Sequence, residues 1–477
     1  MPAARPEEVR EAKPHRGKEG RKIGYAKDKE MQNREVQAPS VPSKAKQGAE
    51  AHSDPRNWTW VEASIWTERM LTALGNGVKG GKWFSLIDKV HSRSTLVAAW
   101  KRVAANKGAA GVDGVSVQRF AQRAAVYLEE LREELVSGKY KPQPVKRVYI
   151  PKVGGGRRPL GIPVVKDRIV QAALKMVLEP IFENEFLPCN YGFRPGKGCK
   201  DALREVDELI KEGYTWVVDA DLKSYFDTIP QKGMLARVAE KVSDGRVLEL
   251  LQLFVEQSIF EGLKTWKPTA GTPQGAVISP LLANLYLHPL DVELRKHGHR
   301  VVRYADDFVI LCRNQAEAER ALELVQIWTS NSGLTLHPDK THLGDCSEPG
   351  QGFEFLGYRF EAGNRWVRRK SLNALRQKIR ERTRRNRGSN MERIIEDLNP
   401  TLRGWFEYFK HAHRWTFRGI DGFVRRRLRS IRRRQMGKQR GTGHCLNDHL
   451  DWPNTYFAGL GLFTMHEARL ALASQSR

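Results

Sequence analysis

Cysteine is scarce in this sequence, and long apolar runs are absent from it. The chain has 477 residues and only five cysteines, and no two of them form a C-x-x-C pair. This spacing argues against a disulfide framework and against a zinc ribbon, and it is typical of a reducing compartment. No apolar stretch is long enough to cross a bilayer, and the first residues lack the apolar segment of a secretory signal. We therefore expect a cytoplasmic protein with no membrane partner.

Acidic residues are also in short supply relative to basic ones. Asp and Glu together number 55 against 81 Lys and Arg, which gives a formal net charge of +26. So large an excess of one sign repels itself in a compact chain and needs a polyanion to offset it. DNA and RNA are the obvious polyanions, and counterion release would make their binding depend strongly on salt. Charge alone does not distinguish an enzyme from a basic scaffold protein.

The composition, with 40% hydrophobic and 29% charged residues, is typical of a globular chain with more than one subdomain. We divide the sequence into five regions, which are 1–55, 56–105, 106–360, 361–440 and 441–477. The first has few large apolar residues and predicts a disordered basic arm. The second predicts a helical N-terminal extension, because apolar side chains recur at helical spacing from Trp60 onward. Region 106–360 has mixed helix and strand patterns, and region 361–440 has an Arg-rich helical pattern. Region 441–477 predicts a small C-terminal module, which is a candidate DNA-binding element.

Two segments place carboxylates at the ends of predicted strands. In VVRYADDFVIL, apolar and β-branched residues flank Asp306 and Asp307, so the segment predicts a β-hairpin with both acids at its turn. The segment TWVVDADLKSYFDTI predicts a strand whose end presents Asp219 and Asp221. Oxygen ligands gathered from two strands suit Mg²⁺. Two such ions can stabilise both the attacking and the leaving oxygen of a phosphoryl transfer.

Each of these features alone has an ordinary structural explanation. An Asp pair in a hairpin turn is usually turn chemistry, and an Asp that ends a strand often caps the next helix. From the residues alone, Phe226 beside Tyr225 is explained as well by a core position as by a binding role. The hypothesis of a metal site therefore depends on the combination of motifs.

That combination resembles the reverse transcriptases, and most closely the reverse transcriptase/maturases encoded by bacterial group II introns. Tyr304-Ala305-Asp306-Asp307 is similar to their Y-x-D-D signature, and Asp221 followed five positions later by Phe226 is similar to their first catalytic motif. The segment GTPQGAVISP is similar to their P-Q-G-x-x-x-S-P segment. The resemblance extends from about residue 106 to about residue 410 and includes NKGAAGVDGVS, YGFRPGKG, LTLHPDKT, FEFLGY and LNPTLRGWFEYFK.

The resemblance implies an α+β fold of the right-hand polymerase type. Fingers and a palm with a split β-α-β core would be followed by an α-helical thumb or maturase domain. It implies RNA-directed DNA polymerisation by two Mg²⁺ ions that Asp221, Asp306 and Asp307 hold, together with binding of intron RNA to assist splicing and mobility. Asp219 remains the alternative to Asp221 as the first metal ligand, although the spacing to Phe226 favours Asp221.

The resemblance also places residues around an incoming nucleotide. Lys146 and Arg168 take positions that contact the triphosphate, and Gln274 belongs to the turn that would approach the nucleotide. Phe226 would lie against the sugar and exclude a 2′-hydroxyl, which favours dNTPs. Residues 140–162 predict the two strands of a fingers hairpin around a Gly-rich turn, and for any single cation there a solvated basic hairpin is the ordinary explanation.

Two further positions have predicted roles near these motifs. Ser279, with Pro280 after it, predicts the N-cap and first turn of a helix. Lys340, in LTLHPDKT, is a candidate general acid for the departing pyrophosphate, although a Lys that closes a loop is usually exposed to solvent.

The Arg-rich region predicts a helical RNA-binding face. In VRRRLRSIRRR, apolar residues recur at steps of three and four, so one side of a helix would pack while Arg covers the rest. Arg425, Arg426, Arg427 and Arg432 are the predicted RNA contacts. Trp405 and the aromatic residues after it could stack on bases, but their helical spacing favours thumb core.

We expect the partners to be group II intron RNA, an RNA template with a DNA primer or target DNA, and dNTPs, with the protein in a cytoplasmic ribonucleoprotein. A homodimer is a candidate assembly that the sequence leaves open. The residues after 441 lack the paired C-x-x-C ligands of an HNH endonuclease module, so we expect none. Two alternatives are a splicing cofactor without polymerase activity and a stand-alone reverse transcriptase of the retron or defence type. The intact acidic positions argue against the first, and LNPTLRGWFEYFK with the long basic thumb argues against the second.

Overall fold

A computed structural model describes most of the chain outside its N-terminal arm. The described residues are 58–78, 80–151, 156–338, 340–386, 388–437 and 446–475. The predicted basic arm at 1–55 lies outside them. None of the helices in these ranges is both long enough and apolar enough to span a membrane.

Within the described residues, five helices precede the first strand. They are α1 (Glu68–Asn76), α2 (Ile87–Val90), α3 (Arg93–Ala105), α4 (Val117–Ala121) and α5 (Ala124–Val136). The prediction of a helix from Trp60 onward is wrong in its start, because the helix begins only at Glu68. Trp66 lies in the turns before it, is buried, and donates its indole N–H to the Met176 carbonyl at 3.1 Å. The apolar residues ahead of α1 therefore dock onto helix α6 (Val165–Glu183) instead of forming a helical stripe.

A four-stranded fingers sheet has the strand order β2-β1-β4-β5. Its strands are β1 (Val145–Pro151), β2 (Arg157–Ile162), β4 (Ile259–Glu261) and β5 (Lys264–Trp266). The predicted fingers hairpin is present as the antiparallel pair of β1 and β2, and its turn includes residues outside the described ranges. Strand β4 pairs with β1 in parallel, so the hairpin is hydrogen-bonded to a strand from the middle of the sequence.

A second four-stranded sheet, the palm sheet, has the order β6-β7-β3-β8. Its strands are β3 (Trp216–Asp221), β6 (Arg300–Tyr304), β7 (Asp307–Cys312) and β8 (His342–Asp345). Strand β7 is antiparallel to both β6 and β3, so β3 and β6 run in the same direction with β7 between them. This is the split β-α-β arrangement predicted for the palm. The α+β fold class predicted from the sequence is confirmed.

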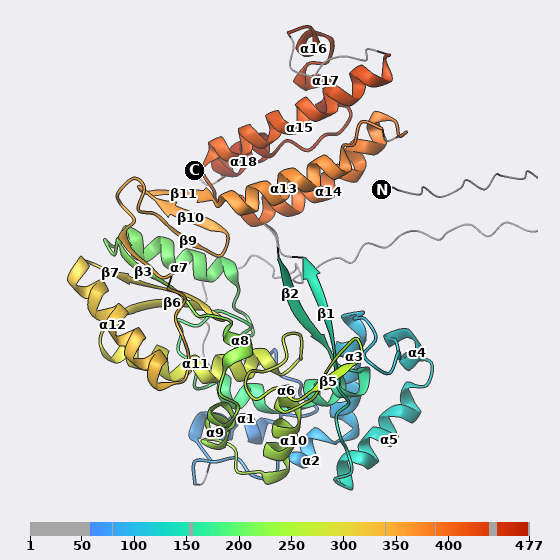
Figure 1. The fold of residues 1–477 in the computed structure, drawn as a ribbon, viewed down its shortest axis with the longest axis vertical. Helices are drawn as coiled ribbons and strands as arrows, with labels where there is room; N and C mark the ends of the chain where they lie inside the picture. The colour runs from blue at the N-terminus through green and yellow to red at the C-terminus, as the bar shows by residue number, and fades with distance from the viewer. Residues whose placement is uncertain are drawn as a thin grey trace, which may run out of the picture. The chain divides into compact units, whose positions relative to one another are not determined.

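Helices cover both faces of the palm sheet (Figure 1). Those around the sheet are α7 (Cys199–Lys211), α8 (Tyr225–Thr228), α9 (Gln231–Ala239), α10 (Gly245–Val255), α11 (Ser279–Lys296) and α12 (Gln315–Asn331). Val218 and Ile310 belong to one hydrophobic cluster with side chains of α11 and α12, whereas Val217 and Leu311 belong to a second cluster with side chains of α7. This alternation is the period of two that a strand with two buried faces requires.

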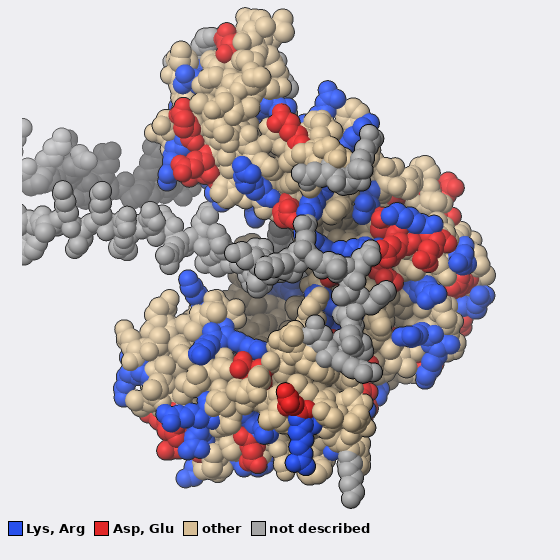
Figure 2. Space-filling view, turned by 180° about the vertical axis from the view of Figure 1, so that it is seen from behind, with Lys and Arg blue, Asp and Glu red and all other residues tan. Residues whose placement is uncertain are grey.

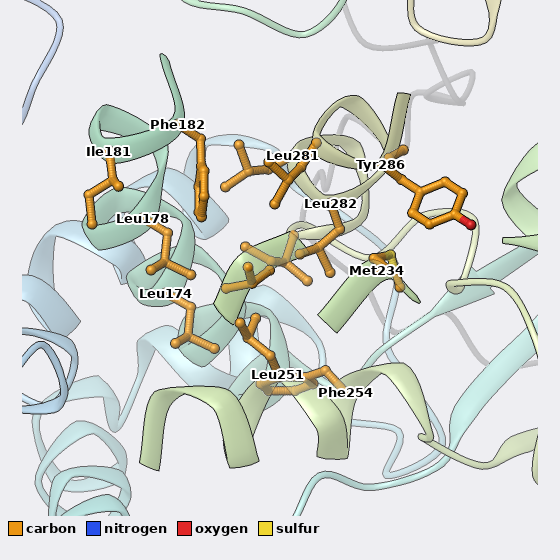
Figure 3. Close-up of a cluster of buried hydrophobic side chains, with 14 of the residues drawn as sticks. Leu174, Leu178, Ile181, Phe182, Met234, Leu251, Phe254, Leu281, Leu282 and Tyr286 are labelled. Atoms are coloured by element: carbon orange, nitrogen blue, oxygen red, sulfur yellow. The ribbon is translucent and has the colours of Figure 1, made fainter. Parts of the chain in front are cut away.

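The first cluster extends from the palm into the N-terminal helices. Figure 3 shows Leu178 and Phe182 of α6 pointing toward Leu281 and Leu282 of α11, with Leu251 of α10 beneath them. Helix α6 follows the fingers hairpin, and α11 leads into the hairpin of β6 and β7. Their packing therefore connects the fingers sheet and the palm sheet through one core.

The C-terminal part is helical after a three-stranded meander. Its elements are β9 (Phe353–Phe355), β10 (Tyr358–Glu361), β11 (Asn364–Val367), α13 (Arg369–Arg382), α14 (Met391–Phe409), α15 (Arg414–Gln435), α16 (Leu446–Asp451), α17 (Asn454–Gly459) and α18 (Met465–Gln475). Val424, Leu428 and Ile431 of α15 are buried. Trp452 and Phe457, from the region predicted to be a small C-terminal module, share the second cluster with side chains of α14 and α15.

Candidate active site

The palm sheet sets two acidic residues directly opposite each other. Asp221 is the last residue of β3, Asp307 is the first of β7, and the two are cross-strand partners. Directly opposed residues of an antiparallel pair project on the same face with short Cβ separations. Asp219, two residues before Asp221, projects on that face as well, opposite Val309 on one side and His342 on the other. Both candidates for the first metal ligand therefore lie on one face, with Asp221 nearer the hairpin turn.

The hairpin turn places Asp306 beside this pair. Tyr304 pairs with Asp307, so Ala305 and Asp306 form a two-residue loop. Ala305 has φ of +62°, the left-handed conformation that tight hairpin turns require. A Cβ on Gly192 would lie 2.2 Å from the Ala305 nitrogen, so only glycine lets the YGFRPGKG segment pack against this turn.

A buried polar network, which no sequence motif indicated, holds the same turn from the side of helix α11. Arg303 is fully buried and forms a bidentate ion pair with Asp291, with contacts of 2.7 and 2.5 Å. Its other terminal nitrogen donates to the Asn284 side chain at 3.0 Å and to the Ala305 carbonyl at 2.9 Å. Asn284 in turn donates to the Gly192 carbonyl at 2.6 Å. Helix α11 thereby fixes the backbone on which Asp306 stands.

All four aspartates line one cleft of about 550 Å³. The remaining lining residues come from the loop before β8, from β8, from β9 and the residue before it, and from the N-cap of α13. They are Lys340, His342, Gly352, Phe353, Glu354 and Arg368. The Lys340 ammonium lies 2.6 Å from Asp221 Oδ2. His337 donates its backbone N–H to the Asp221 carbonyl at 2.7 Å, which anchors the LTLHPDKT loop beside the strand.

Burial and mutual repulsion disfavour ionisation of these carboxyl groups. Burial raises the pKa of Asp307 to about 7, and the charges of Asp306 and Asp221 contribute to the rise. Burial raises the pKa of Asp219 to about 7 as well, with further contributions from Asp307 and Asp221. The pKa of Asp306 is also raised, mainly by burial. A cleft that penalises negative charge in this way favours a cation that would neutralise it.

The donor set fits divalent magnesium. The acidic side chains offer hard oxygen ligands on a partly open cleft, where Mg²⁺ could retain water and share substrate phosphates. The oxygens of Asp221, Asp306 and Asp307 do not form a set within 4.8 Å of one another, and Lys340 pairs with the first of them. Side-chain rotation would be needed for the three to share ions.

The raised pKa of Asp307 gives a test by pH. A carboxyl whose folded-state pKa lies above its unfolded value adds stability at low pH, and this contribution is lost as pH rises through the folded value. We expect the unfolding free energy of wild type minus that of Asp307→Asn to fall between pH 3.8 and about 7 in metal-free protein. Urea titrations with a chelator would measure it. A difference independent of pH would show that Asp307 titrates normally.

A second cleft, of about 260 Å³, lies between the fingers sheet and α8. Phe226 of α8 and Gln274 line it, together with Arg147. Gln274 Oε1 accepts a hydrogen bond from Arg158 Nε at 2.9 Å, and Gln274 Nε2 donates to Asp227 at 3.1 Å. The positive charge of Arg158 partly offsets the rise in the pKa of Asp306. Arg158 therefore interacts both with this cleft, through Gln274, and with the carboxylates of the first cleft.

The backbone of the P-Q-G turn packs against the fingers strand β2. Gly275 has φ of +110°, and a Cβ there would lie 2.4 Å from the Gly161 carbonyl oxygen. The prediction that Ser279 caps α11 is wrong, because Ile278 holds the N-cap position and Ser279 is inside the helix. The Ser279 hydroxyl instead donates to the Pro273 carbonyl at 3.0 Å. The serine therefore ties the turn to the helix.

Lys146 and Arg168, the residues predicted to contact triphosphate, line neither cleft. Lys146 is exposed on β1 and directly precedes Arg147, so the two side chains point to opposite faces of the strand. Arg168 is 8% exposed and donates to the carbonyls of Pro163, at 2.8 Å, and Ala109. Arg147 lines the second cleft, and Arg158 reaches its edge through the hydrogen bond to Gln274. The alternation of side chains along β1 from the buried Val145 was the sequence signal for Arg147.

The four predicted RNA contacts on α15 differ in their surroundings. Arg426 lines a groove of about 350 Å³ between α13 and α15, together with Arg376, Arg380, Phe423 and two glycines. Arg427 lines an adjoining groove and donates to Thr383 Oγ1 at 3.1 Å. Arg425 lies close enough to Asp421 to lower its pKa, and Nε of Arg432 is buried with no partner among the described residues. In Figure 2, Lys and Arg are spread over the visible face with Asp and Glu among them.

Comparison with known proteins agrees with this geometry. A split β-α-β palm with acids at one end of its sheet defines the palm-type polymerases as a class. Residues 150–360 match the family described as "Reverse transcriptase (RNA-dependent DNA polymerase)", and residues 372–448 match "Group II intron, maturase-specific domain". The chain belongs to the reverse transcriptases that carry the maturase-specific domain of group II introns.

Individual relatives match over parts of the chain. It is 37% identical over 306 residues to Protein YkfC of Escherichia coli (strain K12), which covers 55% of this chain and 79% of that protein. It is 28% identical over 328 residues to the group II intron-encoded protein LtrA of Lactococcus lactis subsp. cremoris, which covers 54% of each. The chain thus spans about half the length of LtrA. A solved partial Cas6-RT-Cas1--Cas2 complex matches with a TM-score of 0.33 and 23% identity, over 51% of this chain and 42% of that one.

Proposed function

We propose that this chain is an RNA-directed DNA polymerase that also binds group II intron RNA and assists its splicing and mobility. The observation that carries the proposal is the direct opposition of Asp221 and Asp307 across the palm strands, with Asp306 in the adjoining turn of the same cleft. The family membership supports the reaction class, and the net charge of +26 supports a nucleic-acid partner.

Asp221, Asp306 and Asp307 would hold two Mg²⁺ ions, with Asp219 behind them. When bound, these ions supply charge stabilisation for the attacking 3′-oxygen and the leaving pyrophosphate. Lys340 keeps an ammonium group 2.6 Å from Asp221, where it offers a proton to the departing group. Arg147 and Arg158 offer positive charge to the triphosphate from the adjoining cleft, where such charge stabilises the transition state.

Phe226 is the proposed sugar gate. Its ring lines the cleft beside Gln274 and meets Tyr225 edge-on at 5.6 Å between ring centroids. The Phe226→Val variant should incorporate ribonucleotides at least about tenfold better relative to deoxynucleotides, because the space for a 2′-hydroxyl opens. Primer extension with each nucleotide type measures the ratio. Tyr225→Phe, which removes only a hydroxyl bound to the Ala283 carbonyl, is the control, and unchanged discrimination in Phe226→Val would return Phe226 to a core role.

The arginine groove on the thumb is the proposed contact for intron RNA. The guanidinium groups of Arg380 and Arg426 lie 5.6 and 5.4 Å from the centre of the Phe423 ring. Among the residues that the structure describes, no acidic one lines this groove. The double variant Arg380→Ala/Arg426→Ala should weaken RNA binding and reduce the slope of log affinity against log salt by about 1 to 2. Filter binding at several salt concentrations measures both.

A matched control removes two arginines that already have carboxylate partners. Arg237 lies 2.7 Å from Glu240, and Arg393 lies 3.2 Å from Glu396. Arg237→Ala/Arg393→Ala changes the net charge equally and should leave most of the salt dependence in place. Equal losses in the two double variants would mean that total charge, and not the groove, determines binding.

Primer extension with purified protein tests the function as a whole. We expect Mg²⁺-dependent incorporation of dNTPs on a DNA primer paired to an RNA template. Folded protein that binds intron RNA but extends no primer would point to a splicing scaffold instead.

A further inference from the structure

Three potential metal ligands meet at the end of the palm hairpin that lies away from Asp306 and Asp307. His299 immediately precedes β6, Cys312 is the last residue of β7, and Glu317 is in the first turn of α12. Arg300 and Leu311 are cross-strand partners, so His299 and Cys312 follow as the next opposed pair. One ligand atom from each of the three lies within 4.8 Å of the others. In the part of the chain that the structure describes, no other trio of His, Cys, Asp or Glu meets as closely.

Two of the three side chains are buried, Glu317 is half-buried, and the histidine is incompletely satisfied. Cys312 is fully buried and His299 is 9% exposed. Nδ1 of His299 is buried and has no hydrogen-bond partner among the described residues, which costs free energy unless another ligand satisfies it. One Glu317 oxygen accepts the backbone N–H of Arg313 at 3.0 Å. A carboxylate held in this way is oriented for a second contact.

Burial disfavours charge on both the histidine and the cysteine of the cluster. Burial lowers the pKa of His299, Glu317 opposes this shift, and His297 and Arg320 add to it. Burial raises the pKa of the Cys312 thiol to about 12, Glu317 raises it further, and Arg320 lowers it. The cysteine is therefore a thiol until a cation displaces its proton.

We propose that His299, Cys312 and Glu317 form a zinc site that ties the open end of the catalytic hairpin to helix α12. Imidazole nitrogen, thiolate sulfur and carboxylate oxygen are zinc ligands, and three of them leave a fourth position for water. Mg²⁺ selects oxygen ligands, so this site and the carboxylate cleft take different metals. Binding releases the thiol proton to solvent. Zinc with one thiolate and one carboxylate then carries no net charge, which a buried position tolerates.

This proposal does not rest on polymerase activity, because the ligands lie on the opposite end of β6 and β7 from the acidic turn. A bound ion would join the start of β6, the end of β7 and the first turn of α12. The short segment from Cys312 to Glu317 is the covalent link between β7 and α12. Its expected effect is on the rigidity of the hairpin and on thermal stability.

Metal binding by the full chain tests the proposal. Metal-stripped protein is titrated with Zn²⁺ against a chromophoric chelator, and with Co²⁺ to reveal thiolate-to-cobalt charge transfer in the near ultraviolet. We expect one tightly bound ion, a charge-transfer band and a zinc-induced rise in melting temperature. Cys312→Ser should lose the band and that rise. Cys346→Ser, which alters another buried cysteine outside the cluster, should keep both.

A second variant decides the matter if Cys312→Ser does not fold. Glu317→Gln keeps an acceptor for the Arg313 N–H but loses the charge, and it should bind Zn²⁺ about tenfold more weakly or worse. Unchanged zinc affinity in folded Glu317→Gln, or an equal charge-transfer band in Cys312→Ser and wild type, would overturn the site.

Discussion

Replacing Asp306 and Asp307 together by asparagine is expected to abolish primer extension while the fold and intron RNA binding remain. Asn keeps the size of each side chain and an oxygen, but it removes the two negative charges that the turn brings beside Asp221. Loss of metal-ion stabilisation costs several kcal/mol, so the rate should fall by about 10³-fold or more. Single-turnover extension on an RNA template at saturating Mg²⁺ measures the loss. Because the buried carboxyls repel each other, the folded double variant should be no less stable than wild type.

The control for this experiment lies in the same sheet. Asp345 ends β8, pairs with Trp216 at the far end of β3, and accepts hydrogen bonds from Ser347. Asp345→Asn retains an acceptor there and should extend primers at the wild-type rate. We also expect the Asp306→Asn/Asp307→Asn variant to promote intron splicing, because the proposed RNA contacts lie on the thumb. Robust dNTP incorporation by the double variant would remove these residues from the chemistry. Loss of splicing in folded protein would show that the two functions are not separable.

Local sequence patterns predicted the palm well because its strands are short and both faces are covered. In VVRYADDFVIL, the acids interrupt an apolar run, and a hairpin with a two-residue loop accommodates them without burying either in mid-strand. The pairing register then brings Asp221 opposite Asp307, although the two lie 86 positions apart in the sequence. The sequence could predict that Asp221 and Asp307 lie close together only from the order of the motifs, because nothing within either strand specifies the pairing register.

Roles that depend on distant partners were the ones the sequence could not predict. Arg168 stands in a helix with cationic neighbours in the chain, yet its guanidinium meets the carbonyls of Pro163 and Ala109. Arg303 is one residue before the Y-x-D-D segment, and no local pattern indicates its role, because its partners Asp291 and Asn284 lie on a preceding helix. Only packing of α11 beneath the hairpin reveals what that arginine does.

Removing the charge of Asp291 should be among the most destabilising single changes in the palm. The Arg303 guanidinium is fully buried, and Asp291 is 1% exposed, so Asp291→Asn leaves a cation in the interior without its counterion. Such a change costs about 3–5 kcal/mol. Urea unfolding at neutral pH measures it. Glu240→Gln, which breaks the exposed pair with Arg237, should cost less than about 1 kcal/mol.

A double variant separates stability from positioning. In Arg303→Met/Asp291→Leu both charges are gone, and apolar side chains of similar size should recover most of the lost stability. The Ala305 carbonyl would still lack the donor that Arg303 provides at 2.9 Å, so the turn that carries Asp306 would be less well held. Because misplacement of a reacting group by ~1 Å costs on the order of 10²-fold in rate, kcat should fall by at least about tenfold while KM for dNTP changes little. A stable double variant with wild-type kcat would mean that the register of β6 and β7 alone positions Asp306, and that Arg303 serves only the core.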